Sequence, residues 1–484
     1  MLIKEDQDII KGYFEDSSNL KGGYADSVVF PEDIKALSEF VKEANRKKIP
    51  LTLSGGGTST TGSRIPFGGI VVSLEKFNKI LEISKDRMSS TAQAGVLVED
   101  FKSACEKEGL FYACHPTEKA AFLGGTVATN ASGARSFKYG PTRIYVKRLK
   151  MVLASGEIYE SRRGEKILTK KDSKIVLKSG MQIDIPLPSY KMPKVKNSAG
   201  YFAQDGMDLI DLFIGQEGTL SVIVEIEMGL LKLPSKILSC FVFFKKETDS
   251  WTFAREARFT NALSIEYFDR NSLGLLRLKN SNVPQEAHAA IFFEQEITKE
   301  NEEKVIDGWL KVITKHNASV ENTWVAMTEE RCEKFSEFRY AIPESVNEIV
   351  KRNGFRKLST DIAVPEHKFL EMMNFYTETL KTEKIEHVIF GHIGECHLHV
   401  NLLPKNEKAL LASEETCLKF AKKGVSLGGT VSAEHGIGKT RHKYLEEMYG
   451  KKGILEMAKI KKALDPNCIL GLGNIFPKET LNFL

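Results

Sequence analysis

The chain has 484 residues, of which 42% are hydrophobic and 27% are charged, and its formal net charge is +5. This composition is typical of a globular protein with two to four domains, and the small, scattered charge argues against nucleic acid as a partner. The seven cysteines form no C-x-x-C pair and no iron–sulfur spacing, which indicates reduced thiols. The acidic N-terminal stretch and the lack of a long apolar run predict a cytoplasmic protein, with peripheral contact to the inner face of a membrane left open.

The first predicted helix follows Pro31, because Ile34, Leu37, Val41 and Ala44 recur at helical spacing. The next expected elements are strands at 50–54, 70–74 and 80–84 and a helix at 97–108. Alternating short elements continue to a predicted domain boundary near the sequence MGLLKLPSK. Longer elements are expected after this boundary, namely strands at 240–244 and 262–269 and a helix at about 249–262.

Residues 392–401 read HIGECHLHVN and contain three histidines in a strand-like run. In an extended strand His397, His399 and Asn401 share one face, and the apolar residues between them share the other. His392 lies an odd number of positions before His399, but glycines on both sides allow it to fold back toward that residue. The pattern alone fits either a metal site or a polar, solvent-facing side of a strand.

Three glycine-rich segments, each expected to form a loop, lie earlier in the chain: SGGGTSTTG at 54–62, LGGTVATNASG within 115–140, and FIGQEGTLSVI at 213–223. Glycines let a backbone approach a phosphate closely. The first segment is neither a GxGxxG sequence that opens a helix nor a GxxxxGK loop, so neither a Rossmann nor a P-loop site is predicted. A single glycine-rich turn is commonly just a connection, but three of them within one α/β region indicate a dinucleotide.

These segments, in this order, resemble the PCMH-type FAD-binding domain of the vanillyl-alcohol oxidase family, and KNSAGY at 196–201 resembles its D-lactate dehydrogenase and glycolate oxidase branch. Further similar motifs are FSEFRYAIPE (335–344), STDIAVP (359–365), GHIGECHLHVN (391–401) and GGTVSAEHGIG (428–438). The resemblance covers nearly the whole chain and implies an α+β fold. It implies a two-subdomain FAD-binding domain at 1–231, an α+β, ferredoxin-like cap domain at 232–425, and a C-terminal segment at 426–484 that returns to the flavin site.

The resemblance places FAD on the glycine-rich segments. The cofactor-binding residues that it implies are Gly55, Gly56, Gly57, Thr58, Ser59, Gly62, Pro116, Thr117, Gly124, Gly125, Thr126, Asn130, Ser132, Gly133, Glu217, Gly218, Ile223 and Asn474. Some relatives hold the flavin covalently through a histidine in the first segment. Thr58 stands at that place here, so non-covalent FAD is expected. Asn474 stands at the lysine position of a family turn that usually reads like LNPGK.

The motif SAEHGIG adds Glu434 to His392 and His399. Two histidines and one carboxylate suit zinc or manganese and leave positions open for a substrate. In the resembling dehydrogenases the same motif positions hold a divalent metal, and the adjacent histidine, here His435, is the proposed base. Arg339 offers a planar fork for a substrate carboxylate. Without the resemblance, the EHG sequence fits a helix N-terminus equally well, and an arginine in SEFRYA fits a helix surface.

The function implied is FAD-dependent oxidation of a D-2-hydroxy acid to the 2-oxo acid, with hydride transfer to flavin N5, a metal-assisted histidine base, and a separate electron acceptor such as a quinone, a cytochrome or a flavoprotein. One alternative is a redox-neutral enzyme like alkylglycerone-phosphate synthase, although such relatives carry a histidine where this chain has Glu434. Two others are a non-catalytic FAD electron-transfer subunit and a metal hydrolase. A homodimer is left open.

The chain departs from the family pattern near the expected substrate. His397 replaces a usual asparagine. Pro343 and Ser359 replace a threonine and a lysine that related 2-hydroxyglutarate enzymes use for a second carboxylate, which favours a monocarboxylate like D-lactate. Lys357 is a candidate substitute for that lysine. The residues expected to contact the substrate are Arg339, Lys357, His397 and Asn401.

Overall fold

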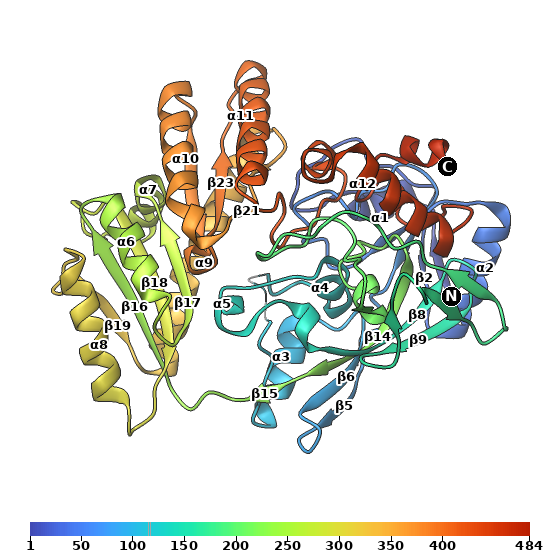
Figure 1. The fold of residues 1–484 in the computed structure, drawn as a ribbon, viewed down its shortest axis with the longest axis horizontal. Coiled ribbons are helices and arrows are strands. Elements are labelled where there is room, and N and C mark those ends of the chain that lie inside the picture. The colour runs from blue at the N-terminus through green and yellow to red at the C-terminus, as the bar shows by residue number, and fades with distance from the viewer. Residues whose placement is uncertain (115, 117) are drawn as a thin grey trace.

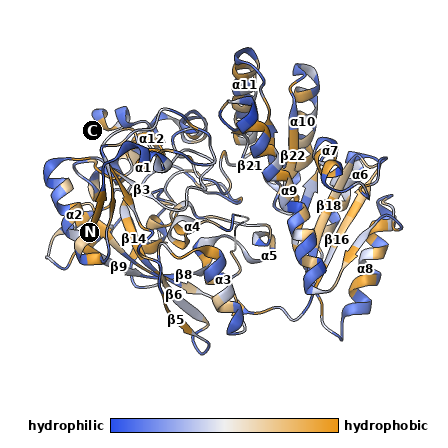
Figure 2. Cartoon of the chain, turned by 180° about the vertical axis from the view of Figure 1, so that it is seen from behind, coloured by the Kyte–Doolittle hydropathy of each residue, from blue (hydrophilic) through white to orange (hydrophobic). Residues whose placement is uncertain are grey.

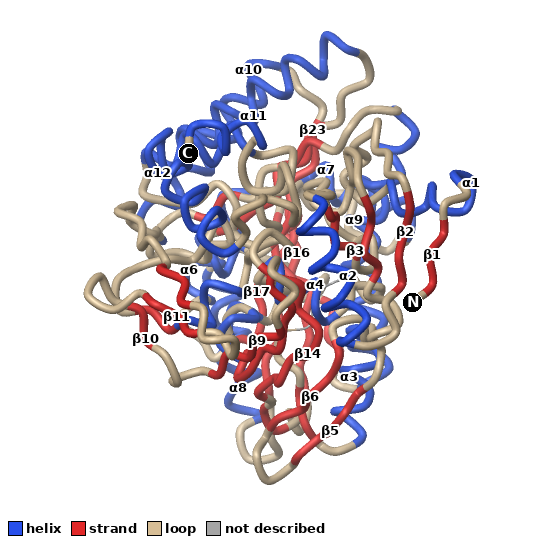
Figure 3. Tube along the Cα trace, turned by 90° about the vertical axis from the view of Figure 1, so that its right-hand side faces the viewer, coloured by secondary structure: helices blue, strands red, loops and turns tan. Residues whose placement is uncertain are grey.

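Two sets of sheets, each with its own helices, lie side by side in the computed structural model, which describes residues 1–114, 116 and 118–484 (Figure 1). The first set contains a sheet of order β1 (Leu2–Lys4), β2 (Ser27–Phe30), β4 (Ile70–Ser73), β3 (Leu51–Ser54). It also contains an antiparallel sheet of order β5 (Ile80–Ser84), β6 (Ser89–Gln93), β14 (Ser221–Gly229), β8 (Val146–Leu153), β9 (Ile158–Arg162). Figure 3 shows β1, β2 and β3 together at one side of the molecule.

The helices of this first half agree with the hydrophobic periodicity. Helix α2 spans Ile34–Lys47, and the carboxylate of Asp33 caps it by accepting the amides of Lys35 and Ala36. Its predicted apolar stripe is buried at Leu37, which belongs to the core of this half. Helix α3 spans Val98–Lys107, within one residue of the predicted bounds at each end. The predicted strands at 50–54, 70–74 and 80–84 are β3, β4 and β5.

The second glycine-rich segment is a helix, where the sequence indicated a loop. Leu123–Thr129 forms α4, which ends at Asn130 in the left-handed region. A Cβ on Gly124 would lie 2.6 Å from the Cβ of Ala94. Small residues therefore serve here to pack α4 closely against the end of β6, a requirement of tertiary packing that local composition does not reveal.

The second half is built on one antiparallel sheet. Its order is β19 (Trp324–Ala326), β16 (Ile237–Phe244), β18 (Ala289–Glu296), β17 (Ala262–Phe268), β22 (His387–Gly391), β23 (His397–Leu402), β20 (Leu358–Ser359), with β21 (Ile362–Ala363) also paired to β23. Helix α6 (Glu247–Ala257) ends earlier than the predicted residue 262, because β17 already begins at Ala262.

Helices cover both faces of this sheet. Alternate strand residues such as Val242 and Val400 pack with α6, α8 (Glu302–Lys315), α10 (Phe369–Glu383) and α11 (Glu407–Ser426). The residues between them, such as Phe241, pack with α7 (Arg270–Lys279) and α9 (Glu329–Asn353). Hydrophobic strands lie between helices with hydrophilic outer sides (Figure 2). His397, His399 and Asn401 alternate with the buried Leu398 and Val400, so the predicted two-faced strand is confirmed.

The chain returns to the first half after α11. Helix α12 (His442–Leu464) lies over that half in Figure 1. Ile437, Leu445 and Leu470 belong to the same core cluster as Val29 of β2. The helices α10 and α11 lie side by side and project from the top of the second half in the view of Figure 1. In the described part of the chain, no helix combines the length and apolarity that crossing a membrane requires.

The returning segment is fitted to the first glycine loop at Gly438. Its φ is +53°, and a Cβ there would lie 2.2 Å from the carbonyl oxygen of Thr61. We expect Gly438→Ala to lower the thermal unfolding midpoint, because the strained backbone and the displaced loop cost on the order of 1–3 kcal/mol. Gly12→Ala is the control, since a Cβ on Gly12 meets nothing within 4 Å. An unchanged midpoint for Gly438→Ala in calorimetry would contradict this account.

Candidate active site

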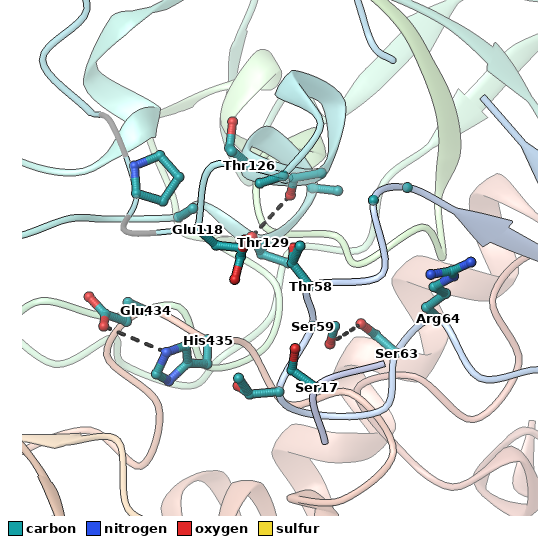
Figure 4. A pocket seen from close by; sticks show the side chains of 18 of the residues that line it. Ser17, Thr58, Ser59, Ser63, Arg64, Glu118, Thr126, Thr129, Glu434 and His435 are labelled. Carbon is teal, nitrogen blue, oxygen red and sulfur yellow. Dashed lines mark hydrogen bonds and ion pairs between the residues drawn. The ribbon is translucent and has the colours of Figure 1, made fainter. Parts of the chain in front are cut away.

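A cavity of about 350 Å³ separates the glycine-rich segments of the first half from the face of the second-half sheet that carries the histidines. Most of the predicted site residues line it: Gly55, Gly56, Gly57, Thr58, Ser59, Pro116, Gly124, Gly125, Thr126, Ser132, Glu217, Gly218, Ile223, Arg339, Lys357, His392, His399, Asn401, Glu434 and His435. Figure 4 shows Glu434 and His435 across this space from Thr126 and Thr129.

Other predicted residues do not border the cavity. Among the described residues these are Gly62, Asn130, Gly133, His397 and Asn474, and Thr117 lies outside the described residues. The side chain of Asn130 accepts the amide of Arg143 at 3.0 Å. Nδ2 of Asn474 donates to the carbonyls of Ser63 and Glu217. Both asparagines therefore hold the loops that border the cavity, and their direct contact with a cofactor stays a prediction.

The glycine segments bring backbone without side chains to the wall of the cavity. A Cβ on Gly56 would lie 2.1 Å from the carbonyl oxygen of Ala120, and Gly57 has a φ of +76°. Gly125 lines the cavity, and a Cβ there would meet no described protein atom within 4 Å, so its absence widens the cavity. This backbone wall fits the FAD that the sequence predicts.

Glu217 connects the third glycine segment to the returning C-terminal segment. Its carboxylate accepts the amides of Ile437 and Gly438, each at 2.7 Å. Burial raises the pKa of Glu217 to about 7, although the two amide donors act in the opposite direction. The residue therefore fixes the position of the C-terminal segment at the cavity wall.

The three predicted metal ligands meet around one carboxylate oxygen. Nε2 of His392 and Nε2 of His399 each lie 3.2 Å from Oε1 of Glu434, and all three side chains are buried. The fold-back of His392 at the glycine turn is therefore confirmed. The ligand atoms of these residues and of His397 all lie within 4.8 Å of one another. Imidazole nitrogens gathered around a carboxylate fit a divalent metal ion.

Glu266 on β17 supports the first histidine from behind. Its Oε1 lies 2.6 Å from Nδ1 of His392, and its Oε2 accepts two hydrogen bonds from Arg339 at 2.7 and 3.0 Å. Burial raises the pKa of Glu266, but the charges of Arg339 and His392 outweigh it and lower the pKa to about 2. For His392 burial acts in the other direction and lowers the pKa, but the charges of Glu266 and Glu434 outweigh it and raise the pKa to about 9. A metal bound at His392 must therefore displace a proton.

Asp361 holds a second group of polar side chains. It accepts hydrogen bonds from Nε2 of His397, Nη1 of Arg441 and Oγ of Ser432 at 2.7 to 2.8 Å. It also accepts the amide of His435 at 2.9 Å, and Nδ1 of that histidine lies 3.2 Å from Oδ1. Burial opposes ionisation, but His435 and Arg441 lower the pKa of Asp361 well below its usual value. The carboxylate therefore orients the candidate base.

Lys196 reaches the cluster from the first half of the chain. Its Nζ donates to Oε2 of Glu434 at 2.7 Å and to Glu395 at 2.8 Å. Burial lowers the pKa of Lys196, but the two carboxylates outweigh this effect and raise it. Because Lys196 occupies Oε2 of Glu434, Oε1 is left to face the two imidazoles.

Sequence reasoning missed the roles of Glu266, Asp361, Lys196 and Arg441. Three of them did carry a signal. Glu266 is an acid inside the apolar strand ALSIEYF, and Asp361 and Lys196 lie in the quoted motifs STDIAVP and KNSAGY. A charged group in a buried strand needs a partner, but its sequence does not say which one.

Removing the charge of Asp361 tests this arrangement. We expect Asp361→Asn to cost about 3–5 kcal/mol of stability, because Arg441 becomes an unpaired buried cation. A marked fall of the unfolding midpoint in differential scanning calorimetry is the expected reading. Asp172→Asn is the control, since it removes the charge of an exposed carboxylate that pairs with Lys166. Equal midpoints for the two variants would show that Asp361 does not stabilise this group of polar side chains.

Comparison with known proteins places the chain in a family. Residues 233–475 match the family "FAD linked oxidases, C-terminal domain", and residues 25–162 match "FAD binding domain". The glycolate oxidase subunit GlcD of Bacillus subtilis is 28% identical over 94% of this chain and 89% of that protein. A D-lactate dehydrogenase of Anaerostipes hadrus is 29% identical over 90% and 86%, and a D-2-hydroxyglutarate dehydrogenase of Stutzerimonas stutzeri is 27% identical over 98% and 96%.

A solved structure shares the fold. The 4-ethylphenol oxidase from Gulosibacter chungangensis has a TM-score of 0.72 at 16% sequence identity, covering 99% of this chain and 95% of that one. The predicted fold class and FAD-linked oxidoreductase family are confirmed by these matches. The chain belongs to the FAD linked oxidases.

Proposed function

We propose that this protein oxidises a D-2-hydroxy acid to the 2-oxo acid, with non-covalent FAD and a divalent metal. The observation that carries the proposal is the single cavity, which has the glycine wall on one side and His392, His399, Glu434 and His435 on the other. The names of the three relatives support the substrate class, because glycolate, D-lactate and D-2-hydroxyglutarate are all 2-hydroxy acids.

The roles of the residues follow from their contacts. FAD, when bound, supplies the acceptor for the hydride that leaves C2 of the substrate. His392, His399 and Glu434 would hold zinc or manganese, and such an ion would lower the pKa of the substrate hydroxyl. His435 borders the cavity and accepts the hydroxyl proton, while Asp361 holds its ring and stabilises the charge that it gains. Arg339 keeps its place through Glu266 and orients the substrate carboxylate.

We propose a short monocarboxylate such as D-lactate as the substrate. Pro343 and Ser359 both line the cavity and neither carries a charge for a second carboxylate. Lys357 also lines it, and its Nζ donates to the neutral amide oxygen of Asn347 at 2.9 Å. Burial and then the charge of Arg441 lower the pKa of Lys357 to about 8. Lys357 is the residue that a second anionic group would meet, and Asn401 borders the same space.

We also propose that residues 1–231, 232–425 and 426–484 act as flavin-binding domain, cap and closing segment. Electrons then pass to a separate quinone, cytochrome or flavoprotein. The distribution of the cysteines supports a separate acceptor, because neither ligand cluster in the described residues includes a cysteine that could hold an iron–sulfur centre.

An anaerobic screen tests the reaction. The purified yellow protein is mixed with the D and L isomers of lactate, glycerate and 2-hydroxyglutarate, with and without a chelator, and the flavin absorbance is followed. Bleaching by the D isomers, fastest with D-lactate and suppressed by the chelator, is expected. Protein without flavin absorbance would point to a metal hydrolase, and flavin that no acid bleaches would point to an electron-transfer subunit.

Glu434→Gln tests the metal ligand, because it keeps the shape of the side chain and removes its charge. We expect the variant to keep FAD, to lose the metal in elemental analysis, and to slow flavin reduction by about a hundredfold or more, since the metal supplies several kcal/mol. Glu330→Gln, at an exposed position paired with Lys334, is the control. Normal metal content in Glu434→Gln would remove this residue from the ligand set.

A further inference from the structure

Of the residues predicted to contact the substrate, His397 is the one that does not line the cavity. Its side chain has no solvent-accessible surface, and it lies on β23 beside His399. Its ring centre is 4.6 Å from that of His399 and 5.3 Å from that of His392. His397 therefore lies behind the two predicted ligands, in contact with them and away from the open cavity.

The ring of His397 is held in the same manner as the ring of His392. One nitrogen of His392 faces the carboxylate of Glu266 and the other faces Glu434. One nitrogen of His397, Nε2, lies 2.8 Å from the carboxylate of Asp361. A carboxylate behind an imidazole fixes the ring so that its second nitrogen can bind a metal. The chain thus has two carboxylate–histidine pairs that converge on one place.

The second nitrogen of His397 is left without a partner. Nδ1 is buried and has no hydrogen bond within the described part of the chain. Because Asp361 also receives donors from Arg441 and Ser432, it is a charged acceptor, and Nε2 of His397 must carry the hydrogen. Nδ1 is then an unprotonated lone pair that meets no hydrogen-bond donor in the described part of the chain. A buried nitrogen without a hydrogen-bond partner calls for an explanation, and a bound ion is one.

Distances place one ring nitrogen of His397 with the other candidate ligand atoms. The candidate ligand atoms of His392, His397, His399 and Glu434 lie within 4.8 Å of one another. Around a tetrahedral zinc with bonds of about 2.0–2.1 Å, ligand atoms are separated by roughly 3.3 Å, so a small inward shift of the side chains suffices.

We propose that His397 is a fourth protein ligand, so that the metal is held by three imidazoles and Oε1 of Glu434. This inference rests on the metal site of the proposed function. A substrate then binds by expanding the coordination of the metal toward the cavity, where His435 lies. The additional imidazole favours zinc over the manganese that oxygen-rich sites prefer.

X-ray absorption at the zinc edge tests the proposal on the reconstituted holoenzyme. Three imidazoles for each zinc are expected in the wild type, and two in His397→Asn. Competition with a chromophoric chelator is expected to show a loss of zinc affinity of at least about tenfold in this variant. His367→Asn, an exposed histidine outside the site, is the control and should match the wild type.

The outcomes separate this proposal from the proposed function. Two imidazoles in the wild type, or unchanged zinc affinity in a folded, yellow His397→Asn protein, would overturn the role of His397 and leave the reaction intact. If His397→Asn does not fold, the imidazole count of the wild type decides alone. Three imidazoles in a protein whose flavin no 2-hydroxy acid reduces would support His397 as a ligand while the proposed reaction fails.

Discussion

The site depends on how the two oxygens of Glu434 are divided. Oε2 pairs with Lys196 from the first half of the chain, and Oε1 faces His392 and His399 from the second. Because all these groups are buried, each charge needs its partner, and the loss of one leaves the others uncompensated. The same carboxylate thus joins the two halves across the cavity, and its Oε1 is the oxygen that would bind the proposed metal.

Antiparallel pairing explains why the other residues converge. Strand β22 lies between β17 and β23, so Phe390 is opposite both Phe268 and His399. Glu266 and the histidines therefore lie at the same end of adjacent strands, on the sheet face that α9 covers with Arg339. The glycine wall lies across the cavity from this end, and the proposed function places the flavin there. Strands hold His399 and Glu266, whereas His392 lies at the turn after β22 and Glu434 and His435 lie on the segment that returns to the first half.

Local patterns predicted what depends on local geometry. Alternation placed His397, His399 and Asn401 on one strand face, and the glycines around His392 predicted its return toward His399. The helix α4 was misjudged as a loop because its glycines serve contact with Ala94, which lies in another element. Glu266 and Asp361 were missed for a similar reason, since they pair with His392 and His397, 126 and 36 residues away. A sequence shows that a buried charge needs a partner, but only the fold identifies it.

The central claim is that a flavin bound at the glycine wall and the cluster of His392, His399 and Glu434 act on the same substrate. The most direct measurement is the anaerobic rate of flavin reduction by D-lactate with hydrogen or deuterium at C2, in metal-loaded and metal-free protein. We expect a primary isotope effect in the metal-loaded protein and greatly slowed reduction without the metal. Flavin reduction at the same rate in both forms, or with no isotope effect, would contradict the claim that the cluster prepares the substrate for hydride loss.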